Sequence, residues 1–233
     1  MIGQRPKGGK GTVVLLAPMR VGVLGSADVG QALGRGFASR GHDVKLGSRS
    51  PKSEALTTWL KQVKGKASTG TFEEAARHGE TIVIATRGSA FDEVARLAGP
   101  KNFAGKVVID VQNALEFSGG PNPGLFVGLN DSLAERVQRA LPEAKVVKAF
   151  NTVPNTQMVD PKFVGGVPDM LIAGNDAAAK KKVVGILKEF GWPGAIDVGG
   201  IEGARWIEAL VPLWALVGSV TNRWDHAFKV VHG

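Results

Sequence analysis

The sequence predicts an α/β protein in which helices cover both faces of a doubly wound parallel sheet. Short runs rich in β-branched residues alternate with longer amphipathic segments, a rhythm that is typical of βαβ units. The chain has 233 residues, 43% of them hydrophobic, and is long enough to bury one large core. Both observations favour one principal sheet.

Five apolar runs have the length and composition of buried parallel strands, at residues 20–24, 43–46, 81–85, 106–111 and 145–150. Helical periodicity predicts helices at residues 29–40, 51–63, 72–77, 91–97 and 131–141. Asn130 or Asp131 is expected to cap the last of these helices. A further strand is expected near residues 66–71, where the pattern is weak.

The regular alternation ends after Phe150. Beyond an irregular stretch, the pattern predicts a strand at 170–173, a helix at 176–190, a strand at 195–198 and a final helix at 201–220. The part of the chain after Phe150 is therefore expected to depart from the βαβ alternation of the part before it. Residues 113–130, with five Gly and Pro residues between 119 and 124, are expected to form a long loop at the carboxyl edge of the sheet.

Residues 1–18 are predicted to be an extension outside the fold. The apolar run 12–17 superficially resembles a secretory signal, but it is short and no small-residue cleavage site follows it. A more natural start lies at Met19. We expect a cytoplasmic protein.

Composition also limits the classes of function. The chain has no cysteine, and its four His residues lack metal-ligand spacing, so no metal site is expected. His42 is expected to cap the turn at Gly41 instead. The net charge of +8 comes from dispersed Lys and Arg residues, which argues against a nucleic-acid partner. The apolar stretch 210–220 is too short to span a membrane, and Pro212 interrupts it.

A glycine-rich turn follows the first predicted strand and opens a predicted helix. It consists of Gly25, Ser26, Ala27, Asp28, Val29 and Gly30. In the dinucleotide fingerprint, the first glycine makes a tight turn, the second lets the backbone approach the pyrophosphate and the third allows close packing of helix and strand. Gly25 and Gly30 fill the first and third roles, whereas Ala27 stands in the second. The alternative is a tight turn that binds no ligand.

The end of the second strand indicates which dinucleotide is bound. NAD-binding proteins commonly place Asp or Glu there to hold the ribose 2′-hydroxyl. This chain offers hydroxyls and cations instead, in Ser48, Arg49, Ser50 and Lys52. Because Arg49 can pair with a 2′-phosphate, NADP(H) is favoured over NAD(H). The alternative is that Arg49 is a solvated surface residue.

Further polar residues are expected along the same sheet edge. Thr86, Arg87 and Gly88 follow the 81–85 strand and are predicted to contact the cofactor, although Arg87 also fits an exposed residue. Asp110 lies near this edge too and equally fits a structural role. No residue stands out as a catalytic acid or base. Hydride transfer accounts for this, because it needs alignment and exclusion of water more than a proton-transfer side chain.

Three segments resemble the NADPH:coenzyme F420 oxidoreductase family: MRVGVLGSADVG at 19–30, LGSR at 46–49 and VVKAFNTVP at 146–154. The resemblance implies an NADP(H)-binding Rossmann domain at residues 19–150 and a small carboxyl-terminal α/β domain at 151–233 packed on it. It also implies transfer of a hydride between NADPH and coenzyme F420. It places NADP(H) on Ser26 to Val29, Ser48 and Arg49. It assigns the nicotinamide and deazaflavin site to the stretch 151–155, that is, to Asn151, Thr152, Val153 and Asn155.

Three residues depart from the family pattern. Ala27 replaces a glycine, Arg87 replaces an apolar residue or proline, and Asn151 replaces a histidine. Two other functions therefore stay open: an NADPH-dependent reductase of a small imine, carbonyl or ferric chelate, and a non-catalytic NADP(H) sensor. The apolar final helix is expected to lie in the core or in a homodimer interface.

Overall fold

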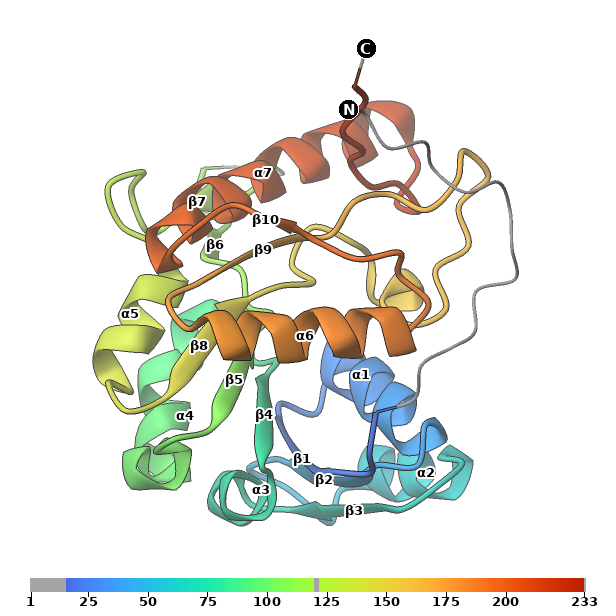
Figure 1. The fold of residues 1–233 in the computed structure, drawn as a ribbon, viewed down its shortest axis with the longest axis vertical. Coiled ribbons are helices and arrows are strands. Elements are labelled where there is room, and N and C mark those ends of the chain that lie inside the picture. The colour runs from blue at the N-terminus through green and yellow to red at the C-terminus, as the bar shows by residue number, and fades with distance from the viewer. Residues whose placement is uncertain (1–15, 120–121, 233) are drawn as a thin grey trace, which may run out of the picture.

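The computed structural model describes residues 16–119 and 122–232 and confirms the predicted α/β class (Figure 1). Eight strands form one sheet in the order β10-β9-β8-β5-β4-β1-β2-β3. The strands are β1 (Arg20–Leu24), β2 (Asp43–Gly47), β3 (Ala67–Gly70), β4 (Thr81–Ile84), β5 (Val107–Asp110), β8 (Lys145–Lys148), β9 (Leu171–Gly174) and β10 (Ile196–Asp197). Neighbours from β3 to β8 are parallel, whereas β9 pairs with β8 antiparallel.

Two hydrophobic cores lie on opposite faces of this sheet. The helices are α1 (Asp28–Ser39), α2 (Glu54–Gln62), α3 (Phe72–His78), α4 (Phe91–Ala98), α5 (Leu133–Ala140), α6 (Ala177–Glu189) and α7 (Ala204–Thr221), with short 3-10 helices at Gly88–Ala90, Pro100–Phe103, Asn155–Gln157 and Ile201–Gly203. Buried residues of α1, α2 and α6 form one core, and those of α3, α4, α5 and α7 form the other. The sheet is thus doubly wound, as the sequence predicts.

The order of strands changes direction at β1. This strand pairs with β2 on one side and with β4 on the other, in parallel register in both cases. Its residues Val21 to Leu24 are fully buried, because helices cover both faces. In open α/β sheets, ligands bind outside the carboxyl ends of the strands at such a switch point. The turn that follows β1 is therefore the first place to look for a site.

The carboxyl-terminal segment adds its strands to the same sheet. Strand β9 bonds to β8, β10 bonds to β9, and α6 lies over β8 and β9 (Figure 1). The division of the chain into two domains after residue 150 stays a prediction. Of the predicted extension, residues 1–15 lie outside the described part of the chain. None of the described helices is long and apolar enough to cross a membrane.

Two local predictions are wrong. Within the expected loop 113–130, β6 (Leu115–Glu116) and β7 (Gly124–Leu125) pair as an antiparallel hairpin, although residues 120–121 at its tip are outside the description. The N-cap of α5 is Ser132 rather than Asn130 or Asp131, because the Ser132 hydroxyl accepts a hydrogen bond from the backbone N–H of Glu135. The Asp131 carboxylate instead accepts hydrogen bonds from Arg136 and Arg139.

His42 does not cap a turn, which corrects a third prediction. Its side chain is fully buried, and Nδ1 accepts a hydrogen bond from the backbone N–H of Met19 at 3.2 Å. The proton therefore resides on Nε2, which donates to the Glu189 carboxylate at 2.9 Å. Glu189 also accepts from the backbone N–H of Leu16 at 3.3 Å. The pair fastens the segment before β1 to the end of α6.

The Asp131 contacts predict an acid-dependent loss of stability. The hydrogen bonds from Arg139, aided by Arg136, lower the pKa of Asp131 to about 2 from its ordinary 3.8. A depressed carboxylate pKa contributes stability above the ordinary value, and this contribution is lost as the pH falls from about 4 toward 2. Asp131→Asn should lower the free energy of unfolding by about 1 kcal/mol at pH 7, since solvent screens a partly exposed pair. Thermal unfolding should show that the Tm difference from wild type shrinks between pH 5 and pH 3. A Tm difference that is the same at both values would contradict this origin.

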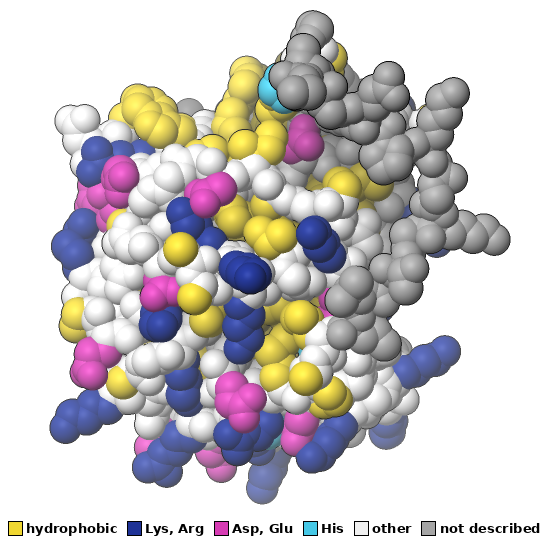
Figure 2. Space-filling model, viewed as in Figure 1, with side chains coloured by type: hydrophobic (Ala, Val, Ile, Leu, Met, Phe, Trp, Pro, Cys, Tyr) yellow, Lys and Arg dark blue, Asp and Glu magenta, His cyan; other side chains and the backbone are white. Residues whose placement is uncertain are grey.

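Charged side chains of both signs are interspersed on the face shown in Figure 2. Hydrophobic side chains gather along the top of this view, where α7 lies (Figure 2). Four of the exposed large apolar residues belong to α7: Trp206, Leu213, Leu216 and Val220. The predicted homodimer stays a prediction.

Candidate functional site

The turn between β1 and α1 has the geometry that the dinucleotide fingerprint requires at two of its three positions. Gly25 has φ of +125°, and a Cβ there would lie 2.4 Å from the carbonyl oxygen of Ala85. A Cβ on Gly30 would lie 1.9 Å from the carbonyl oxygen of Gly25, so only glycine lets α1 pack this close to β1. Ala27 has φ of −83° and ψ of −176°, an extended conformation open to any residue. The backbone itself therefore does not require glycine at position 27.

A cavity of about 540 Å³ opens beside this turn, and we call it the serine cavity after Ser26, Ser48, Ser50 and Ser53 in its lining. The hydroxyl of Ser26 donates to the Ser48 hydroxyl at 3.1 Å, and the backbone N–H of Ser50 donates to the same oxygen at 3.1 Å. Arg49 lines the cavity and is exposed. It forms no ion pair with any residue in 16–119 or 122–232. A hydroxyl pair beside an unpaired guanidinium fits a phosphate monoester.

A larger cavity of about 820 Å³ adjoins the serine cavity, and we call it the phenylalanine cavity after Phe117 and Phe126. It runs past the start of α1 to the β6–β7 hairpin, and its lining includes Asp28, Val29, Gly88, Gln112 and Asn113. The two cavities share four lining residues: Ala27, Ala85, Thr86 and Arg87. They form one cleft across the carboxyl ends of β1, β2, β4 and β5, with the cationic Arg49 at one end and aromatic rings at the other.

A third cavity of about 260 Å³ continues the cleft toward α7, and we call it the tryptophan cavity after Trp214 and Trp224. It shares Asn113, Leu115 and Phe117 with the phenylalanine cavity. Asn151 and Val153, from the segment after β8, also line it. The structure thus brings these two predicted residues to the far end of the same cleft.

Four predicted site residues lie apart from the cleft lining. Thr152 is buried, at 5% exposure, and lines none of the three cavities. Asn155 lines a separate groove beside Arg35 and Asp160. Lys52 is exposed but does not line the serine cavity, and Gly30 is buried within α1. The roles predicted for these four residues rest on the sequence alone.

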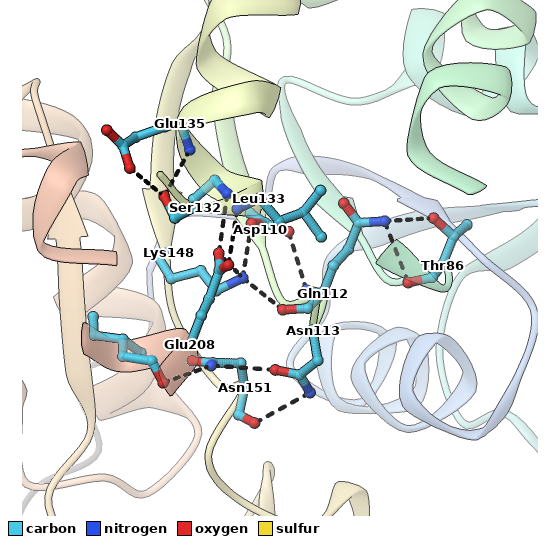
Figure 3. A network of polar contacts seen from close by, with 12 residues as sticks. Thr86, Asp110, Gln112, Asn113, Ser132, Leu133, Glu135, Lys148, Asn151 and Glu208 are labelled. Carbon is cyan, nitrogen blue, oxygen red and sulfur yellow. Dashed lines mark hydrogen bonds and ion pairs between the residues drawn. The ribbon is translucent and has the colours of Figure 1, made fainter. Parts of the chain in front are cut away.

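A buried polar network supports the floor of the cleft (Figure 3). The Gln112 side-chain amide donates to the hydroxyl of Thr86 at 2.8 Å and to the carbonyl oxygens of Thr86 and Arg87. Lys148 Nζ donates to the Gln112 carbonyl oxygen at 2.5 Å and contacts Asp110 Oδ2 at 2.9 Å. The network thereby fixes the backbone after β4 relative to β5 and β8.

Glu208 completes the network from the other end of the chain. One of its carboxylate oxygens lies 3.0 Å from Lys148 Nζ, and the two together accept the backbone N–H groups of Leu133 and Ala134 at the start of α5. Burial alone would lower the pKa of Lys148, but Asp110 and Glu208 outweigh it and raise that pKa above its ordinary value. The roles of Lys148 and Glu208 in this network were not predicted from the sequence. The signal was a lysine inside the apolar run 145–150 and a glutamate on the apolar side of the last helix.

A model of the family described as "NADP oxidoreductase coenzyme F420-dependent" matches residues 20–114. The F420-dependent NADP reductase of Methanothermobacter marburgensis is 30% identical over 206 residues, which cover 84% of this chain and 90% of the relative. The chain belongs to this family. The match confirms the predicted family. It also confirms the prediction of an NADP-dependent oxidoreductase with NADP(H) as its cofactor.

This chain covers very different shares of its other relatives. A protein of Arthrobacter sp. FB24, named a candidate F420-dependent NADP-reductase, is 37% identical to this chain. Its crystal structure aligns with a TM-score of 0.88 over 92% of this chain and 100% of that one. Metalloreductase STEAP3 of Rattus norvegicus is 32% identical over 202 residues. The match covers 84% of this chain but only 38% of the metalloreductase. The relatives of this chain are therefore named for different acceptors.

Proposed function

We propose that the protein transfers a hydride between NADP(H) and coenzyme F420 or a related flavin-like acceptor. The observation that carries the proposal is the continuous cleft from Arg49 to the tryptophan cavity, at the switch point of the sheet. Its three adjoining cavities and the change from a cationic to an aromatic lining suit a dinucleotide followed by a second ring system.

The described residues fit NADP(H). Ser48 and Arg49 would hold the 2′-phosphate, because a guanidinium and hydroxyl groups are the usual partners of a phosphate monoester. The Gly25–Gly30 turn and the first backbone N–H groups of α1 would face the pyrophosphate. The nicotinamide would enter the phenylalanine cavity beside Val29 and Gly88. When bound, this cofactor supplies or accepts the hydride at its nicotinamide ring.

The acceptor would occupy the phenylalanine and tryptophan cavities together. Leu115, Phe117 and Trp214 give it an apolar wall, and none of the residues that line the tryptophan cavity is charged. Such a wall excludes water and holds two rings face to face, which is what hydride transfer needs. The acidic residues in the described lining of the cleft, Asp28, Glu93 and Glu116, are exposed.

The test is to mix purified protein with NADPH and oxidised coenzyme F420 and to follow the loss of both absorbances. Equal, protein-dependent loss of the two would support the proposal. A ferric chelate and a cyclic imine serve as comparison acceptors under the same conditions. NADPH oxidation with those acceptors alone would overturn F420 as the partner while leaving the oxidoreductase in place, and binding without any turnover would favour a sensor.

A ferric chelate is the second candidate acceptor, and the relationship to the rat metalloreductase is the observation that favours it. No group of three or more His, Cys, Asp or Glu side chains that would hold a metal ion is found in residues 16–119 and 122–232. A chelated iron would therefore react as a bound substrate rather than at a resident metal centre. The two acceptors are distinguished by an assay with NADPH and a ferric chelate, in which the coloured complex of a ligand with ferrous iron measures the reduction of the iron.

Ala27 gives a prediction about cofactor affinity. Ala27→Gly should tighten binding of NADPH and NADH alike by about two- to fivefold, because removal of the methyl group lets the pyrophosphate approach the backbone whichever ribose is present. Isothermal titration of both nucleotides measures the change. Affinity that is unchanged, or tightened for only one nucleotide, would show that the turn already accommodates the methyl group.

A further inference from the structure

The serine and phenylalanine cavities meet at a few residues that line both of them. The residues common to both linings are Ala27, Ala85, Thr86 and Arg87, which we call the seam. In a dinucleotide the pyrophosphate joins the two nucleoside halves. If the 2′-phosphate lies at Arg49 and the nicotinamide at the far end, the pyrophosphate has to cross the seam. The charges at the seam therefore decide how well the pyrophosphate is bound.

Arg87 is the one charged residue among the four at the seam. Its side chain is exposed, and it forms no ion pair with a residue in the described ranges. Its backbone, in contrast, is held in place, because Gln112 donates a hydrogen bond to its carbonyl oxygen at 3.2 Å. A fixed backbone with an unpaired guanidinium is the arrangement expected of an anion-binding residue rather than of a surface ion pair.

The wall of the cleft at Ala27 and Asp28 is poorly suited to bind an anion by itself. Ala27 puts a methyl group where the fingerprint places glycine, and Asp28 adds a carboxylate in the first turn of α1. The Asp28 carboxylate interacts favourably with the helix dipole, but it repels a phosphate that approaches the backbone N–H groups at the start of α1. A cation in the lining of the same cavity attracts the phosphate and so compensates for the weaker binding at this wall.

We propose that Arg87 binds the pyrophosphate of the dinucleotide and offsets the weakened wall at Ala27 and Asp28. Thr86 assists it, because its hydroxyl oxygen already accepts from Gln112 at 2.8 Å and its proton is left to donate to a phosphate oxygen. The inference rests on the proposed function for the cofactor, and it is independent of the acceptor. It differs from the role of Arg49, which depends on the 2′-phosphate.

The test measures dissociation constants of NADPH, NADH and adenosine 2′-monophosphate by titration calorimetry, for wild type, Arg87→Ala and Arg87→Lys. Arg87→Ala should weaken NADPH and NADH by the same factor of about ten, the size expected for one exposed charge-assisted contact. Binding of adenosine 2′-monophosphate, which has no pyrophosphate, should change by less than about twofold. Arg87→Lys should keep part of the affinity, since it keeps the charge but loses the planar donor pair.

Arg96→Ala is the matched control, since Arg96 is exposed on α4, C-terminal to the seam in the chain, and lines none of the three cavities. It should leave all three constants unchanged. Equal NADPH affinity for wild type and Arg87→Ala would overturn the inference alone. So would a loss confined to NADPH and adenosine 2′-monophosphate, which would place Arg87 on the 2′-phosphate, or an equal loss in the control. Failure of the wild type to bind NADPH would overturn the proposed cofactor together with this inference.

Discussion

Lys148→Met is expected to lower the free energy of unfolding by about 3–5 kcal/mol, the usual effect of removing one partner from a buried ion pair. Lys148 is fully buried and contacts Asp110, Glu208 and the Gln112 carbonyl oxygen. The variant leaves two buried carboxylates and a carbonyl oxygen without their cation. Urea unfolding followed by tryptophan fluorescence should show the loss as a lower midpoint.

Two variants separate this mechanism from a loss of packing. Lys145→Met removes a lysine from the same strand at a half-exposed position, where the pair with Asp176 is on the surface, and should cost at most about 1 kcal/mol. The triple variant Lys148→Met, Asp110→Asn and Glu208→Gln discharges the whole cluster and should recover part of the loss. A Lys148→Met midpoint equal to that of wild type would show that the network contributes nothing to stability.

The same network connects stability with the site. Lys148 holds the Gln112 backbone, and Gln112 in turn holds the Thr86–Arg87 backbone that borders both larger cavities. Glu208 ties this floor to α7, whose side chains line the tryptophan cavity. Lys148 and Glu208 line none of the three cavities and therefore help to position the cleft without touching the proposed ligands.

The parts of the fold that sequence analysis predicted depend on local patterns. The β1–α1 unit was predictable because its strand is continuously apolar, its helix is periodic and Gly25 and Gly30 mark the turn between them. The same reasoning located β9, α6 and β10 to within a few residues. In each case neighbouring residues carry the signal.

The parts that were missed depend on contacts between distant segments. Nothing near β9 specifies that it runs antiparallel to β8, because that direction is set by the path of the whole connection. His42 and Glu189 meet across the fold, as do Lys148 and Glu208, and neither pair follows from spacing. The family resemblance grouped Asn155 with Asn151, yet the 3-10 helix at Asn155–Gln157 carries Asn155 to another groove.

Arg49→Ala is expected to weaken NADPH binding by about 10- to 150-fold, which corresponds to a charge-assisted contact of about 1.5–3 kcal/mol. Binding of NADH should change by less than about twofold, because NADH has no 2′-phosphate for Arg49 to meet. The structural basis is the position of Arg49 in the serine cavity, beside the hydrogen-bonded hydroxyls of Ser26 and Ser48. Titration of both nucleotides into wild type and variant gives the two ratios directly.

Lys52→Ala tests whether this selectivity belongs to Arg49 or to general positive charge near the cavity. Lys52 is exposed three residues further along the chain but does not line the serine cavity, so its removal should weaken NADPH by less than about threefold. Arg49→Lys should fall between Arg49→Ala and wild type, because an ammonium keeps the charge without the planar pair of donors. Equal weakening of NADPH and NADH by Arg49→Ala would instead place this guanidinium on a group that the two nucleotides share. A wild type with equal affinity for both nucleotides would show that the end of β2 does not select for the 2′-phosphate.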